Sequence, residues 1–144
     1  MKEFYTVILL FLGLIVNAQQ QEVQQSIETF FEGFHERDTV RMKSVCADKV
    51  VLQSISESLV KGNKLTEENS GKFYKSIATI PSNIKFSEKI LSYNIQIEGT
   101  IAHVWAPYQF YVNDKLSHSG VNTFTLFKEK DTWKIIYLID TRRK

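Results

Sequence analysis

The sequence predicts an α+β domain in which N-terminal helices pack into the concave face of a curved, mainly antiparallel sheet. Apolar residues recur at helical spacing in the first half of the chain and alternate every second residue in the second half, from about residue 84 onward. Helices followed by a run of strands are the element order typical of α+β domains. The 144 residues are enough for one such domain with its own core.

The first 18 residues are set apart from this pattern. Lys2 precedes an apolar run over 4–16, which ends in small residues at Val16 and Ala18. This arrangement is typical of a signal peptide, with cleavage between Ala18 and Gln19. The run is short for a helix that crosses a bilayer core of about 30 Å. We therefore expect a signal peptide over 1–18, one domain over 19–144, export to the periplasm or the medium, and no membrane attachment after cleavage. The alternative is a buried N-terminal helix.

Three helices are predicted before the sheet. The segment 22–36 places five apolar side chains on one helical face: Val23, Ile27, Phe30, Phe31 and Phe34. Asp38 is suited to cap a short helix over 39–46, because its carboxylate can accept the first free backbone N–H groups. Thr66 is predicted to cap a third helix over 67–80, which Pro81 ends. Between the last two, 49–55 is predicted as a short strand and 61–64 as a turn.

The second half of the chain is predicted to form a four-stranded antiparallel meander. Its strands are expected over 84–97, 101–112, 116–127 and 133–140, with turns at 98–100 and 113–115. Pro107 lies inside the second strand and has no N–H to donate, so we expect a bulge or bend there. Such a bend would let the sheet curl.

Composition argues against several classes of function. The net charge of +2 is too small to indicate a nucleic-acid partner, and no basic stripe carries interleaved aromatic residues. Cys46 is the only cysteine, so an intrachain disulfide is impossible. The three histidines, at 35, 103 and 118, do not have the spacing of a metal site. We predict no metal and no cofactor.

The order of the elements is similar to that of the nuclear transport factor two-like superfamily, whose fold is a cone-shaped, cystatin-like α+β domain. The segments 102–120 and 133–144, with "HSG" at 118–120 and "DTRR" at 140–143, resemble the lumazine-binding branch of that superfamily. The resemblance implies a cavity at the open end of the cone and a homodimer formed through the outer face of the sheet. It does not imply a defined reaction.

A cavity of this kind is predicted to bind a small hydrophobic or heteroaromatic ligand, because ligand sites are mostly apolar with a few placed polar groups. Tyrosine and tryptophan add a hydrogen-bond donor to an apolar body, which suits flat heteroaromatic molecules. Periodicity leaves open which face of each strand is concave. The candidate ligand-binding residues are Phe31, Phe34, Trp105, Tyr108, Phe110, His118, Asn122 and Arg142.

The candidates for acid–base chemistry are His35, His118 and Asp140. His35 follows the aromatic stripe, and His118 belongs to the "HSG" segment. Asp140 shares a strand face with Arg142, which is able to bind a carboxylate or phosphate. The predicted strands over 84–97, 101–112 and 116–127 contain no aspartate, which argues against a buried aspartate as the base.

Three functions follow from these observations. The first is an exported ligand-binding domain, the second is an isomerase-type or dehydratase-type enzyme with an acid–base group in the cavity, and the third is a structural or interaction domain whose cone is filled by its own side chains. The size of the cavity separates the first from the third, since ligand cavities measure about 300 Å³ or more.

Overall fold

The computed structural model describes residues 2–144, with side chains from Asn17 onward. It contains three helices and seven strands among these residues: α1 (Lys2–Glu36), α2 (Thr39–Ser44), β1 (Cys46–Ser56), β2 (Lys64–Glu68), α3 (Ser70–Ala78), β3 (Phe86–Ile90), β4 (Asn94–Glu98), β5 (Ile101–Val112), β6 (Lys115–Glu129) and β7 (Thr132–Arg142). The strands form one curved sheet in the order β2-β1-β7-β6-β5-β3, with β4 also paired to β5. Every pairing is antiparallel except β1 with β7, so the predicted α+β class with a mainly antiparallel sheet is confirmed.

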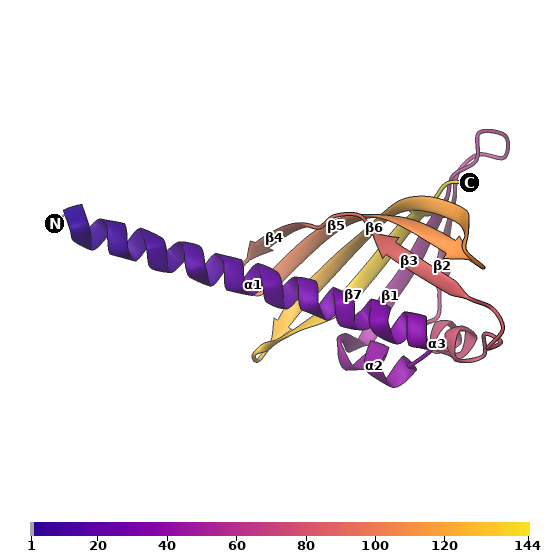
Figure 1. Ribbon diagram of the computed structural model, residues 1–144, viewed down its shortest axis with the longest axis horizontal. Helices are drawn as coiled ribbons and strands as arrows, with labels where there is room; N and C mark the ends of the chain where they lie inside the picture. The colour runs from indigo at the N-terminus through magenta and orange to yellow at the C-terminus, as the bar shows by residue number, and fades with distance from the viewer. Residues whose placement is uncertain (1) are drawn as a thin grey trace.

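The concave face of the sheet packs on α1, which crosses it while α2 and α3 lie near its C-terminal end (Figure 1). The predicted apolar stripe accounts for this packing, because Val23, Ile27 and Phe30 are almost completely buried. On the sheet side, the even-numbered residues of β5 and β6 face inward. The core against the stripe consists of Ala102, Val104, Phe124, Leu126, Trp133 and Ile135.

The N-terminal part of α1 extends beyond the sheet (Figure 1). The helix is continuous across the predicted cleavage position between Ala18 and Gln19. The side chains of Asn17 and Ala18 are exposed, and Val23 is the first buried residue in the described part of the helix. Within the part of the chain that the structure describes, no helix combines the length and apolar character needed to cross a membrane. The predicted signal peptide stays a prediction.

The second helix is confirmed, and the third is shorter than predicted. Asp38 accepts hydrogen bonds from the N–H groups of Val40 and Arg41, so it caps α2 as expected. The prediction that Thr66 caps a helix from 67 is wrong, because 64–68 forms β2 at the edge of the sheet, paired with β1. Asn69 caps α3 instead, since its side chain accepts from the N–H of Lys72. Both residues are good caps, and tertiary pairing with β1 decides between them.

The predicted strand over 84–97 is two strands, β3 and β4, which pair with successive parts of β5. The backbone breaks over 91–93, opposite Pro107, whose carbonyl accepts from the N–H of Leu91 at 2.8 Å. In an antiparallel strand, the N–H and the carbonyl of one residue point to the same neighbouring strand. Pro107 has no N–H, so it cannot donate a second hydrogen bond to the segment 91–93, where the strand is broken. In the pairing of β5 with β6, the register shift lies further along, between Phe110 and Tyr111, rather than at Pro107 where a bulge or bend was predicted.

Candidate functional site

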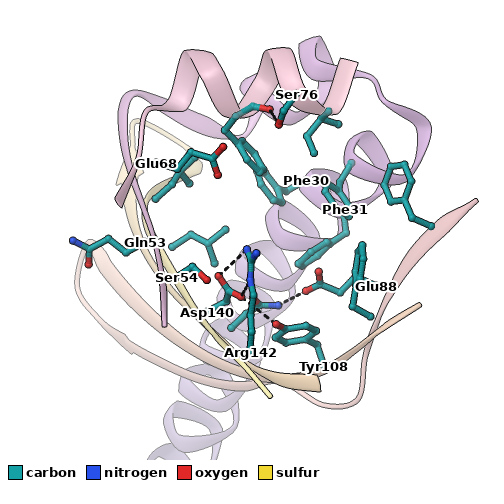
Figure 2. Close-up of a pocket in the computed structure, with 18 of the residues that line it drawn as sticks. Phe30, Phe31, Gln53, Ser54, Glu68, Ser76, Glu88, Tyr108, Asp140 and Arg142 are labelled. Carbon is teal, nitrogen blue, oxygen red and sulfur yellow. Dashed lines mark hydrogen bonds and ion pairs between the residues drawn. The ribbon is translucent and has the colours of Figure 1, made fainter. Parts of the chain in front are cut away.

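A cavity of about 340 Å³ lies between α1, α3 and the concave face of the sheet (Figure 2). One part of its wall is aromatic and comes from both helical and strand segments. Edge-to-face contacts such as Phe34 against Phe86, with ring centroids 5.0 Å apart, hold these rings in place. The rings that line the cavity are Phe30, Phe31, Phe34, Phe73, Phe86 and Phe110.

The opposite part of the wall is polar and centres on three side chains from β5 and β7. The hydroxyl of Tyr108 donates to the carbonyl of Thr141 at 2.8 Å and lies 3.1 Å from Oδ2 of Asp140. Nε of Arg142 donates to the same Oδ2 at 2.7 Å. The two residues share a face of the strand, as predicted. The side chain of Asp140 is 13% exposed and that of Arg142 is 51% exposed. Burial and the charge of Asp140 raise the pKa of Tyr108, so its hydroxyl stays protonated.

A second polar pair, Glu88 and Asn122, faces this group from β3 and β6. The amide Nδ2 of Asn122 donates to Oε1 of Glu88, and Asn122 is the one buried polar residue among the described side chains. Burial raises the pKa of Glu88 to about 7, and the charge of Asp140 acts in the same direction against the opposing hydrogen bond from Asn122. Near neutral pH the carboxyl group therefore exists in both protonation states.

The hydroxyl of Ser54 also lines the cavity. It comes from β1, opposite Asp140 in the parallel pairing with β7. The hydroxyl oxygen is buried and has no hydrogen-bond partner among the residues that the structure describes. An unpaired buried hydroxyl costs free energy, so a polar atom inside the cavity would satisfy it.

The histidine candidates occupy different positions. His118 lines the cavity beside Phe110, with ring centroids 4.9 Å apart, and burial together with the charge of Arg142 lowers its pKa. His35 does not line the cavity, contrary to its role as a catalytic candidate. Its Nε2 accepts a hydrogen bond from the backbone N–H of Glu88 at 2.9 Å, and burial lowers its pKa. His35 therefore supports β3 at the position of Glu88.

Most of the predicted site residues meet in this one cavity. Trp105 is the exception among the ligand-binding candidates, because odd-numbered residues of β5 point to the outer face, where Trp105 is 51% exposed. Its predicted place in the cavity is wrong. The outer face is where the resemblance puts a homodimer contact, and the dimer stays a prediction. The predicted residues that line the cavity are Phe31, Phe34, Tyr108, Phe110, His118, Asn122, Asp140 and Arg142.

Glu88 is the residue that sequence reasoning missed. The alternation of Leu91, Tyr93, Ile95 and Ile97, extended backward through an assumed single strand, puts Glu88 on the wet face. The break over 91–93 shifts the phase, so that the even-numbered residues of β3 face inward. The local pattern of Phe86 and Ile90 around Glu88 carried this information. The predicted strands over 84–97, 101–112 and 116–127 contain no aspartate, but the cavity holds the carboxyl groups of Glu88 on β3 and Asp140 on β7.

The arrangement can bind and exchange protons. Glu88 can accept or give up a proton near neutral pH, and the Asp140–Arg142 pair offers a fixed acceptor and a cation at the same wall. Among the described residues, no three His, Cys, Asp or Glu side chains gather in the way a metal ion requires.

Neither the family models nor the curated proteins include a match to this chain. Solved structures do match. A protein of unknown function from Shewanella baltica, named NTF2-like (nuclear transport factor two-like), has a TM-score of 0.63 and 18% identity, over 88% of this chain and 95% of its own. The beta subunit of a provisionally named aromatic-ring-hydroxylating dioxygenase from Novosphingobium aromaticivorans has a TM-score of 0.72 and 13% identity, over 90% and 92% of the two chains.

A provisionally named dehydratase of the NTF2-like family from Streptomyces avermitilis has a TM-score of 0.66 and 16% identity, over 89% of this chain and 98% of its own. At such identities the likeness concerns the fold alone. The narrower resemblance to the lumazine-binding branch stays a prediction. With its helices set into a curved seven-stranded sheet, the chain has the cone-shaped NTF2-like, cystatin-like fold.

Proposed function

We propose that this protein binds a small hydrophobic or heteroaromatic molecule in the cone cavity. The observation that carries the proposal is one cavity of about 340 Å³ with a phenylalanine wall on one side and a polar wall on the other. This volume is within the range of ligand cavities, whose lower end is about 300 Å³, which favours an occupied cone over one filled by its own side chains.

The two walls set different demands on the ligand. The aromatic wall favours a flat apolar body that stacks or packs against rings such as Phe31 and Phe34. The unpartnered hydroxyl of Ser54 and the carboxyl group of Glu88 favour a polar edge with hydrogen-bonding groups. A flat heteroaromatic ring, of the kind that the resemblance to lumazine-binding proteins implies, meets both demands.

Native mass spectrometry of the chain purified from its own host tests this function. We expect a small mass that is retained in the native state and released on denaturation. The neutral probe N-phenyl-1-naphthylamine should also bind at one molecule per chain, with a rise in fluorescence. Leu138→Trp, which fills the cavity, should reduce probe binding at least about tenfold while the far-UV circular dichroism stays unchanged.

Trp105→Ala on the outer face is the matched control and should leave probe binding unchanged. Absence of both a retained mass and probe binding would reject the ligand-binding function and favour an interaction domain.

Glu88 supports acid–base catalysis as a second candidate function. A carboxyl group with a pKa of about 7 is matched to proton transfer at neutral pH, and Arg142 next to Asp140 offers a cation for a developing negative charge. An isomerase-type or dehydratase-type reaction would use Glu88 as the base. Any turnover found with carbonyl or hydroxyl substrates should fall at least about a hundredfold in Glu88→Gln, and an unchanged rate would exclude this role.

We also propose that the chain is exported and that the mature protein begins at Gln19. Removal of 1–18 takes away no described core residue, because Val23 is the first of them. Intact-mass analysis of the envelope and culture-medium fractions should therefore find a chain that starts at Gln19. An intact chain starting at Met1 in those fractions would contradict the proposed cleavage.

A further inference from the structure

A second hollow adjoins the cavity at the end of the cone where β1 and β7 finish. One side of it is the loop between β1 and β2, and the other is the C-terminal segment. Figure 1 shows the C-terminus beside the β1–β2 hairpin. Two residues, His118 and Arg142, line both this hollow and the cavity. We call the second hollow the outer groove; its other residues are Ser56, Glu57, Ser58, Leu59, Lys61, Asn63, Arg143 and Lys144.

The outer groove carries an excess of positive charge. Among the described residues, the cations that line it are Lys61, Arg142, Arg143 and Lys144, and the one acid is Glu57. Arg142 is paired with Asp140 of the cavity wall. Glu57 lies 3.5 Å from Nε of Arg143, so it offsets part of that charge. Lys61 and Lys144 are exposed and have no ion-pair partner among the residues that the structure describes. A groove with an excess of positive charge attracts anions over a distance of about one Debye length, roughly 8–10 Å in ordinary buffers.

The cavity has the opposite balance. Asp140 offsets the charge of Arg142, and the carboxyl groups of Glu88 and Glu68 add negative character to the wall. An anionic group deep in the cavity would therefore lie near carboxylates and lose its hydration. The same group in the outer groove would keep contact with water and face cations. The two hollows thus favour different ends of one molecule.

Arg142 is the side chain at the junction. Its Nε and Nη2 face Asp140, at 2.7 and 3.4 Å, and half of the side chain is exposed to solvent. The remaining donors of the guanidinium group are free to contact an anion at the mouth, and guanidinium matches the planar shape of a carboxylate.

We propose that the ligand is an amphipathic anion. Its apolar body lies in the phenylalanine-walled cavity, and its carboxylate, phosphate or sulfonate group lies in the outer groove near Arg142, Arg143 and Lys144. This proposal rests on the ligand-binding function proposed above and adds the ligand's charge and orientation to it.

Two fluorescent probes with nearly the same body test the proposal. The anion 8-anilinonaphthalene-1-sulfonate carries a sulfonate that the neutral N-phenyl-1-naphthylamine lacks. In low-salt buffer we expect the anion to bind about tenfold or more tightly, as one charge-assisted contact can provide, and this advantage should shrink as salt is added. Leu138→Trp should weaken binding of both probes, which places their bodies in the cavity.

The double variant Arg143→Gln with Lys144→Gln should weaken binding of the anionic probe about tenfold and leave the neutral probe unchanged. Lys49→Gln with Lys89→Gln is the matched control, because it removes the same charge from exposed positions outside the groove. The control should leave both affinities unchanged.

The outcomes separate the two proposals. Equal affinities for the two probes, or equal losses in the groove and control variants, would overturn the amphipathic anion while leaving a ligand-binding cavity in place. If neither probe binds and no small mass is retained in the native state, the ligand-binding function fails as well.

Discussion

Replacing Gly120 with alanine is expected to lower the free energy of unfolding by about 3 kcal/mol or more, at the upper end of the cost of overpacking or above it. A Cβ at this position would overlap the carbonyl oxygen of Thr141 and lie 2.7 Å from its carbonyl carbon. These are backbone atoms of β7, so no rotamer change can relieve the contact, and the strand itself has to move.

That movement would also disturb the polar wall of the cavity. The carbonyl of Thr141 accepts the hydrogen bond of Tyr108, and its Oγ1 accepts from the N–H of Val121 at 3.0 Å. Gly120 is also the residue paired with Tyr108 across β5 and β6. The glycine of the "HSG" segment is therefore explained by close approach of two strands next to the site.

Urea unfolding of Gly120→Ala against the wild type measures this effect. Gly71→Ala in α3 is the control, because only the side chain of Asn69 lies near its added Cβ and alanine favours a helix. The added Cβ lies 3.2 Å from Oδ1 of Asn69, a side-chain atom that can shift, so the control should change stability far less than Gly120→Ala. A Gly120→Ala protein with wild-type stability would show that β6 and β7 do not approach as closely as the structure indicates.

The fold was predictable where one periodicity holds over many residues. The stripe from Val23 to Phe34 lies on a helix as predicted, although α1 begins at Lys2 rather than at 22. The long strands β5, β6 and β7 are confirmed within two residues at each end. Prediction failed where two local signals compete. Thr66 and Asn69 are both good caps, and only the pairing of 64–68 with β1 decides that the helix starts late.

The site could be predicted only as far as the sequence shows which face of each strand points inward. Strand alternation puts Tyr108 and Phe110 on one face of β5 and Trp105 on the other. Which of the two faces is concave depends on where α1 packs. The inward position of Glu88 depends on the change in alternation at the break between β3 and β4. The alternation within β4 does not indicate that change. Residues from separate strands form the polar wall, so their convergence is a property of the curved sheet rather than of any segment.

The second large effect concerns Glu88 and pH. Its pKa is raised from 4.5 to about 7 in the folded protein, so between these values the folded state binds more protons than the unfolded state. The stability that this group contributes is therefore fully present below its pKa in the unfolded state. It is lost as the pH rises through the folded-state pKa of about 7. The shift corresponds to about 3 kcal/mol in total, of which about 2 kcal/mol or more is lost between pH 5 and pH 8.

Glu88→Gln keeps the shape of the neutral side chain and removes its titration. We expect the variant to exceed the wild type in urea unfolding by about 1 kcal/mol or less at pH 5 and by about 3 kcal/mol at pH 8. His35 and His118 have lowered pKa values, so their contribution rises with pH and opposes that of Glu88. They are present in both proteins, and the hydrogen bond from the backbone N–H at position 88 to His35 is unaffected by the substitution. The difference between the two proteins therefore isolates Glu88.

Glu129→Gln, at an exposed position of β6, is the matched control and should leave the pH dependence of stability unchanged. If the free energy of unfolding changes between pH 5 and pH 8 by the same amount in Glu88→Gln as in the wild type, the carboxyl group is not held in a desolvated site. Glu88 would then lose its suitability as a base, and the acid–base function would lose the group that supports it. A gain that grows toward high pH would show that the fold tolerates a costly charge at this wall, which is the expected mark of a residue placed for binding or proton transfer rather than for stability.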